Sequence, residues 1–281
     1  MAVPDWKSIG VSPVGRKEKT MPDYSALDQS SAINYIFYPR RDFTPCPKNA
    51  FDLAIPVKGE VAISCRFHFG DRQWPWILFF HGNGEVVSDY DEIAPFYHQQ
   101  KLNLVVADYR GYGTSGGIPT LTDLVRDAQT IFEGVQKELG ERGFSSNLWV
   151  MGRSLGSISA LELGYRYPER IKGLIIESGF CSVVRIITHL GIHASGIDLE
   201  KIDRECVEMI KKIPIPVLIM HGEQDTLVPV QEAKDLFRNL GTDKKELLTI
   251  PRATHNDIMS VGSKKYFDTL QQFIERFLRN L

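Results

Sequence analysis

The hydrophobic pattern changes along the chain from alternation to continuous apolar runs. Residues 51–57 and 61–69 are predicted as two edge strands joined by a hairpin turn at Lys58-Gly59-Glu60, and residues 61–69 alternate apolar positions with polar or small ones, which is the period of a half-buried strand. Residues 33–38 are predicted as an earlier first strand. Six apolar runs follow, at residues 76–80, 104–107, 148–151, 173–176, 217–220 and 247–250. Runs without alternation are typical of parallel strands that helices cover on both faces.

The segments between these runs have helical periodicity. Helices are predicted at residues 91–100, 121–139, 155–167 and 230–240, and a last helix has an apolar stripe that includes Phe267, Leu270, Phe273, Ile274, Phe277 and Leu278. Alternating strands and helices predict an α/β fold with a mostly parallel, doubly wound sheet and helices on both faces. Residues 31–281 then form a single domain, and residues 1–30, which are polar and contain three prolines, are predicted to be a loosely held lead-in.

Residues 180–213 separate two predicted core strands by more than an ordinary connection. They contain two segments with helical patterning, residues 183–190 and 199–212. In sheets of this type, ligands bind beyond the carboxyl ends of the strands. The insert emerges at that end, so it is a candidate lid. The alternative is that it only replaces a crossover helix, and the sequence does not decide between the two.

Composition narrows the class of protein. The chain has 281 residues, 43% of them hydrophobic, and a formal net charge of −2, so nucleic-acid binding is not predicted. We find no signal-peptide pattern and no apolar run long enough to span a membrane, although peripheral membrane contact stays open. The four cysteines lack the spacing of a disulfide framework or a metal site, which favours free thiols and a cytoplasmic location. No cofactor, metal ion or obligate protein partner is predicted.

The most informative motif is Gly152-Arg153-Ser154-Leu155-Gly156, which lies between a predicted buried strand and a predicted helix. A serine at such a turn is held in a strained conformation with its hydroxyl above the sheet, and the flanking glycines allow the strand and helix to approach closely. Ser154 is therefore a candidate nucleophile. The alternative is that Ser154 is only a helix N-cap.

A serine nucleophile needs a base, and the base needs a partner that fixes its tautomer. His255 follows the last predicted strand, and Asp225 follows the strand before it. Ser154, Asp225 and His255 thus come in the order serine, acid, histidine, each just past the end of a strand. Two other carboxylates compete for the role of the acid: Glu177, which ends the preceding strand, and Asp257, which fits better as a turn or cap residue.

With these motifs the chain resembles the α/β-hydrolase superfamily of serine hydrolases, and its pattern is similar to esterase, lysophospholipase and thioesterase-like members with a small lid. Two further segments carry the resemblance, residues 81–84 (His-Gly-Asn-Gly) and residues 108–115, which begin Asp-Tyr-Arg-Gly. The resemblance implies that Ser154 is the nucleophile, His255 the general base and Asp225 the residue that orients it. It further implies an oxyanion hole formed by the backbone N–H groups of Asn83 and Leu155.

Several other residues have competing interpretations. His81 and His221 are expected to be structural, and Asp108 and Arg110 to fix a loop. His189 and His193 have the spacing of a metal pair on a helix, but no third ligand is evident. The apolar helix at 183–190 could face an acyl chain or a membrane surface, although packing onto the sheet is favoured for so short a segment.

The function that the sequence predicts is hydrolysis of a carboxylic ester or thioester, small or lipid-like, through an acyl-serine intermediate. Two alternatives use the same fold: a peptidase or C–C hydrolase, and a non-catalytic ligand-binding or scaffold protein. A peptidase of this fold usually has a large extra domain, for which the sequence has no room. The natural substrate, its acyl length and head group, any transferase side activity and the oligomeric state do not follow from the sequence.

Overall fold

The computed structural model describes residues 21–278, and its centre is an eight-stranded sheet in the order β1-β2-β4-β3-β5-β6-β7-β8. Its strands are β1 (Ala50–Val57), β2 (Val61–His68), β3 (Trp76–Phe80), β4 (Asn103–Ala107), β5 (Leu148–Arg153), β6 (Leu174–Glu177), β7 (Val217–Gly222) and β8 (Lys245–Ile250). β2 pairs antiparallel with both β1 and β4, and the strands from β4 to β8 pair in parallel. The mostly parallel sheet and the hairpin at residues 58–60 are therefore confirmed.

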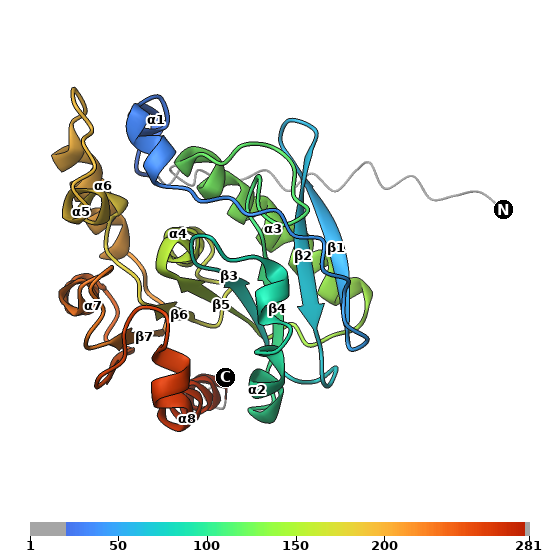
Figure 1. The fold of residues 1–281 in the computed structure, drawn as a ribbon. Coiled ribbons are helices and arrows are strands. Elements are labelled where there is room, and N and C mark those ends of the chain that lie inside the picture. The colour runs from blue at the N-terminus through green and yellow to red at the C-terminus, as the bar shows by residue number, and fades with distance from the viewer. Residues whose placement is uncertain (1–20, 279–281) are drawn as a thin grey trace, which may run out of the picture.

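Helices cover both faces of this sheet, as the continuous apolar runs predict. On β3, Trp76, Leu78 and Phe80 belong to one hydrophobic cluster, while Ile77 and Phe79 belong to a second cluster on the opposite face. The first face is covered by α3 (Leu121–Glu141), α4 (Ser157–Arg166) and α7 (Val230–Asn239), and the second by α2 (Ala94–Gln99) and α8 (Ile258–Leu278). Figure 1 shows α2 and α8 on one side of the strands and α3 and α4 on the other.

The predicted strand at residues 33–38 is wrong. The chain instead forms a 3-10 helix, η1 (Ser31–Tyr35), in which the Ser30 side chain accepts a hydrogen bond from the backbone N–H of Ala32 at 3.2 Å. Ile36 and Phe37 of this segment pack onto the core and are nearly inaccessible, whereas Tyr35 and Tyr38 are exposed. β-Branched and aromatic residues fit a strand equally well, so the local pattern alone does not separate the two conformations.

The predicted lead-in is anchored where the structure describes it; residues 1–20 lie outside the described range. A single helical turn, α1 (Ser25–Asp28), follows the buried Tyr24 and contains the buried Leu27. The carboxylate of Asp28 accepts hydrogen bonds from the first two backbone N–H groups of α3, Leu121 at 2.7 Å and Thr122 at 3.1 Å. A carboxylate at this end of a helix satisfies unpaired N–H groups and complements the helix dipole.

The insert at residues 180–213 forms the two helices that the sequence predicts, α5 (Val183–His189) and α6 (Leu199–Ile210). They lie together at one side of the molecule, near α4 and α7 (Figure 1). Arg185 on α5 binds Asp203 on α6 at 2.8 Å and Asp235 on α7 at 3.4 Å. These ion pairs tie the insert together and to the body of the domain.

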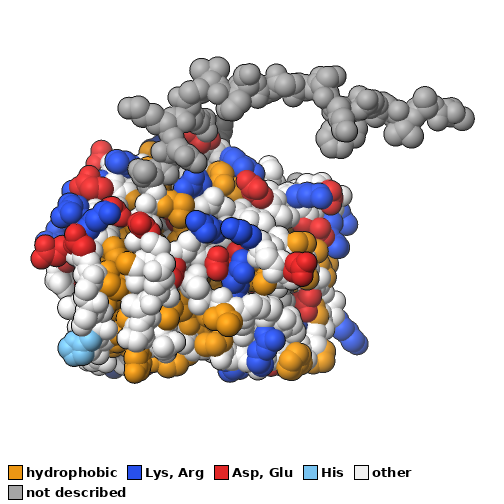
Figure 2. Space-filling model, turned by 90° about the horizontal axis from the view of Figure 1, so that it is seen from above, with side chains coloured by type: hydrophobic (Ala, Val, Ile, Leu, Met, Phe, Trp, Pro, Cys, Tyr) orange, Lys and Arg blue, Asp and Glu red, His pale blue; other side chains and the backbone are white. Residues whose placement is uncertain are grey.

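The view from above shows one face of the molecule, on which basic and acidic side chains are intermingled (Figure 2). Hydrophobic side chains lie between them in several small groups. A surface in which both signs of charge are mixed creates no strong field of one sign.

The anchoring of α1 gives a stability test. We expect Asp28→Ala to lower the free energy of unfolding by about 1 kcal/mol, because two N–H groups of α3 lose their acceptor. Urea denaturation of this variant and of Gln29→Ala, a neighbouring exposed position, measures the difference. Equal unfolding midpoints for the two variants would contradict a capping role for Asp28.

Candidate active site

Ser154 lies at the turn between β5 and α4, in a short 3-10 segment, η3 (Ser154–Gly156). Its φ of 50° falls in the left-handed region that side chains rarely adopt. A side chain at position 152 would collide with the backbone carbonyl of Gly156, and one at position 156 with the backbone carbonyl of Phe80 on β3. Glycines are therefore required on both sides of the serine, and the strained turn has the geometry of a nucleophile elbow.

Asp225 and His255 come from the loops that follow β7 and β8, and they meet in the folded chain. The Nδ1–H of His255 donates to Asp225 Oδ2 at 2.7 Å, and both residues are buried. The other carboxylate oxygen accepts backbone N–H groups from Leu227 at 3.0 Å and Val228 at 2.8 Å. The histidine therefore has its second ring nitrogen, Nε2, available for a partner other than Asp225.

Charge at Asp225 is stabilised by its partners. Burial alone would raise the pKa of the Asp225 carboxyl, but hydrogen bonds from His221 and His255, the charge of His255 and the N–H of Val228 together hold that pKa well below its usual range. Asp225 is thus an anion throughout the neutral range, which is what a residue that stabilises an imidazolium requires.

His221 is a second histidine against Asp225. Its Nε2–H donates to the backbone carbonyl of Val228 at 2.7 Å, and the same nitrogen lies 3.3 Å from Asp225 Oδ2. The sequence predicted only a structural role for His221. It gave no sign of the contact with Asp225, because the two side chains meet only through the fold of the loop after β7.

Glu177 lies in a different set of contacts. Its carboxylate accepts hydrogen bonds from Arg153 Nε at 3.0 Å and from the hydroxyl of Tyr266 on α8. Burial raises the pKa of Glu177, against the opposing effects of Arg153 and Tyr266. The third carboxylate considered from the sequence, Asp257, accepts the backbone N–H of Thr254 at 2.6 Å and so holds a turn. Of the three, it is Asp225 that is hydrogen-bonded to the ring of His255.

Ser154 opens onto a cavity of about 490 Å³, a size typical of small-molecule sites. Asn83 and Leu155, whose backbone N–H groups are the candidate oxyanion donors, line the same cavity. The side chain of Asn83 makes three hydrogen bonds to other segments: its Oδ1 accepts from Tyr112 OH at 2.6 Å and Tyr38 N–H at 2.9 Å, and its Nδ2 donates to Ile36 O at 2.7 Å. These bonds fix the loop after β3 beside the serine.

The walls of the cavity are mainly apolar and come from three parts of the chain. They are Tyr35, Ile36 and Tyr38 from the segment before β1, Phe180, Val183, Ile186, Ile187, Leu190 and Ile192 from the insert, and Leu227 and Val228 from the loop after β7. The sequence favoured packing of the helix at 183–190 onto the sheet, and the structure shows that one side of α5 lines the cavity. The sequence also missed the contribution of residues 35–38, which it assigned to a strand.

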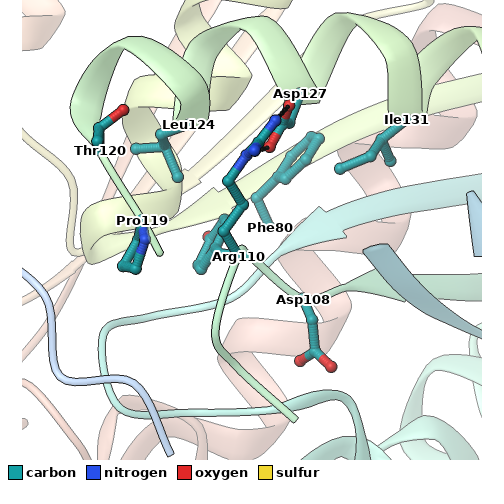
Figure 3. Close-up of a pocket in the computed structure, with 9 residues that line it drawn as sticks. Phe80, Asp108, Arg110, Pro119, Thr120, Leu124, Asp127 and Ile131 are labelled. Atoms are coloured by element: carbon teal, nitrogen blue, oxygen red, sulfur yellow. Dashed lines mark hydrogen bonds and ion pairs between the residues drawn. The ribbon is translucent and has the colours of Figure 1, made fainter. Parts of the chain in front are cut away.

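A second, much smaller cavity of about 10 Å³ lies beneath the loop after β4 (Figure 3). Arg110 forms a two-pronged ion pair with Asp127 on α3, at 2.6 and 2.9 Å. Asp108 also lines this small cavity, and its Oδ1 accepts the N–H of Val87 at 3.0 Å and faces His81 Nε2 at 3.2 Å. Asp108 and Arg110 fix loops and His81 is structural, as the sequence predicts.

Two features bear on metals and membranes. Within residues 21–278, no group of three or more His, Cys, Asp or Glu side chains is arranged to hold a metal ion, and His189 Nε2 instead faces the carbonyl of Thr226 at 3.1 Å. No helix in the same range combines the length and the apolar character that crossing a membrane requires.

Comparisons with known proteins show which family the chain is similar to. The profile of a family described as serine aminopeptidase, S33, matches residues 74–197 and 193–259. The chain is 32% identical to protein bem46 of Schizosaccharomyces pombe, over 71% of this chain and 67% of that one. It is 30% identical to the human alpha/beta hydrolase domain-containing protein 17B, over 73% and 68% of the two chains. In structure it is similar to the esterase Pf2001 of Pyrococcus furiosus, with a TM-score of 0.69, 19% sequence identity and coverage of 85% and 98%.

Proposed function

Since the chain belongs to the α/β-hydrolase superfamily, within the family described as serine aminopeptidase, S33, we propose that it is a serine hydrolase that cleaves a carboxylic ester or thioester. The observation that carries the proposal is the buried Asp225–His255 hydrogen bond, together with a strained serine that opens onto an apolar cavity. A base held in one tautomer and a nucleophile at a strand-to-helix turn that opens onto the substrate cavity are the requirements for acyl transfer to serine.

The proposed reaction follows from these roles. His255 takes the proton of Ser154 while its oxygen attacks the carbonyl carbon, and Asp225 stabilises the imidazolium that forms. The backbone N–H groups of Asn83 and Leu155 hold the negative oxygen of the tetrahedral intermediate. His255 then protonates the departing alcohol or thiol, which leaves an acyl-serine. Water, activated by the same histidine, releases the carboxylic acid and restores the serine.

The cavity supports a substrate with an apolar acyl portion. Most of its lining is aliphatic or aromatic, and burial of each methylene in such surroundings contributes about 0.8 kcal/mol. Val183, Ile186 and Ile187 of the insert form part of this lining. An acyl chain in contact with these side chains would place its carbonyl near Ser154, which lines the same cavity.

The aminopeptidase activity in the family's description is less well supported. An enzyme that recognises a free amino terminus needs a negative group to bind the ammonium, since a buried unpaired charge is costly. Among the described residues that line the cavity, none is Asp or Glu. The lining therefore favours an uncharged acyl group over a peptide amino terminus.

The remaining alternative is a non-catalytic protein that retains the fold. Nothing in a binding role alone requires a buried carboxylate on the ring of His255 or a strained φ at Ser154. Strained backbone is retained where it serves a function, so the φ of Ser154 favours catalysis. The Asp225–His255 hydrogen bond favours catalysis because it prepares the imidazole to act as a base.

The proposal is tested with a fluorophosphonate probe and a series of aryl esters and acyl thioesters. We expect the probe to form a covalent adduct on Ser154, and Ser154→Ala to lose the adduct and at least about a thousandfold in kcat, because the nucleophile is removed. Full activity in Ser154→Ala would end the proposal. Binding of an acyl ligand without labelling or turnover would favour the non-catalytic alternative.

The assignment of the acid is tested by a pair of isosteric variants. We expect Asp225→Asn to lower kcat by about 10²–10⁴-fold, since the amide no longer fixes the tautomer or stabilises the cation of His255. Glu177→Gln should lower kcat by less than about tenfold, because Glu177 contacts Arg153 and Tyr266 rather than the imidazole. Steady-state kinetics of both variants decide the assignment, and the opposite order of effects would make Glu177 the acid.

The cavity is tested with p-nitrophenyl esters of increasing chain length. We expect kcat/KM to rise about fourfold per methylene until the cavity is filled. Ile186→Trp, which narrows the cavity, should reduce kcat/KM for long chains by about tenfold or more and leave the acetate ester nearly unchanged. Ile118→Trp is the control, because Ile118 is exposed and is not part of the lining. An equal loss for short and long chains would contradict an acyl-binding role for this wall.

A further inference from the structure

Arg153, the residue before the candidate nucleophile, forms hydrogen bonds to several other segments around the candidate site. Its Nε donates to Glu177 at 3.0 Å, and its Nη1 donates to Glu85. Its Nη2 donates to the backbone carbonyl of His255 at 2.8 Å and to Asn256 Oδ1 at 2.9 Å. One guanidinium thus joins the serine turn to the loop that carries the candidate base.

The same guanidinium reaches the loop after β3, which we call the β3 loop (residues 81–86). Glu85, its partner there, also accepts the backbone N–H of Gly82 at 2.7 Å and the hydroxyl of Tyr90 at 2.7 Å. Gly82 itself lies directly on Arg153, since a side chain at position 82 would collide with Nη1. The β3 loop carries Asn83, so a candidate oxyanion donor follows immediately after the residue that contacts Arg153.

The cluster combines one guanidinium with two carboxylates. Arg153 and Glu177 are buried, and Glu85 is partly buried. Burial opposes the charge of the guanidinium, but the carboxylates of Glu85 and Glu177 raise the pKa of Arg153 above its ordinary value. Each carboxylate also has a hydroxyl donor, from Tyr90 and from Tyr266. Buried ions held in this way have a fixed geometry, because any displacement leaves a charge unpaired.

We propose that Arg153 is a positioning residue, which holds the β3 loop and the loop of His255 at fixed distances from Ser154. The inference rests on the proposed function, because it assigns these two loops to the oxyanion hole and the base. A guanidinium suits the role, since its donors leave a rigid plane in several directions. A lysine ammonium keeps the charge but donates from one atom at the end of a flexible chain, so it cannot hold both loops.

The chain contains a matched control for this test. Arg66 on β2 is also buried and binds two carboxylates, Asp52 and Asp91, together with the carbonyl of Thr44. It does not line the cavity that contains Ser154. Arg153→Lys and Arg66→Lys therefore make the same chemical change in two similarly buried ionic clusters, of which Arg153 alone is joined to the proposed catalytic loops.

The experiment compares thermal stability, kcat, KM and the rate of fluorophosphonate labelling of Ser154 in the two lysine variants. We expect both variants to lower Tm. Arg153→Lys should also reduce kcat and the labelling rate by about 10- to 100-fold with KM changed less than about threefold, because misplacement of catalytic groups by about 1 Å costs rate on this scale. Arg66→Lys should keep kcat within about twofold of the unaltered protein.

Three results would overturn the inference: unchanged kcat in Arg153→Lys, an equal loss of kcat in Arg66→Lys, or an effect on KM alone. If Arg153→Lys does not fold, Glu85→Gln provides the test, because it keeps the size of a partly exposed side chain and weakens its bonds to Arg153 and Gly82. It should lower kcat several-fold at constant KM, and unchanged kcat would again overturn the inference. Loss of activity in Ser154→Ala separates these failures from failure of the proposed function, which would leave Ser154→Ala active.

Discussion

The close passage of the turn after β5 past the end of β3 is the constraint on which the site depends. At Gly156 the backbone of the turn lies so near the carbonyl of Phe80 that no side chain fits between them. The turn places Ser154 beside the loop after β3, where both Ser154 and Asn83 line the cavity, and the φ of Ser154 lies in the left-handed region. Asn83 and Leu155 line the same cavity as Ser154, because Asn83 lies on the loop after β3 and Leu155 lies on the turn itself.

Parallel pairing extends this constraint to the candidate acid and the candidate base. β6, β7 and β8 continue from β5 in one direction, so their carboxyl ends meet at a single edge of the sheet. Glu177, Asp225 and His255 all lie at that edge, and what separates their roles is their hydrogen-bond partners. Asp225 has donors on both of its oxygens and stays ionised, whereas Glu177 is joined to a guanidinium and a tyrosine. The same edge thus holds two carboxylates in different surroundings, only one of which contacts an imidazole.

Elements with a strong local signal were predictable from the sequence. The apolar runs gave the parallel strands, and polar residues directly after them gave Ser154, Asp225 and His255 as candidates. Features that depend on contacts between distant segments could not be predicted from the sequence. Residues 33–38 have strand-like composition, yet the cap at Ser30 and packing onto the core make a 3-10 helix and part of a cavity wall. Arg153 also gave no signal, because Glu85, Glu177 and the carbonyl of His255 meet it only after folding.

The cavity wall that the insert contributes is held both by buried apolar residues of the main core and by ion pairs. Arg185 on α5 binds carboxylates on both α6 and α7, so the helix that lines the cavity is connected to a helix packed on the sheet. Partly exposed ion pairs add little stability individually, but a network of them fixes orientation. A wall held in this way needs little reorganisation when an apolar group enters, which lowers the entropic cost of binding. The insert thus forms one side of the cavity and is connected by ion pairs to α7.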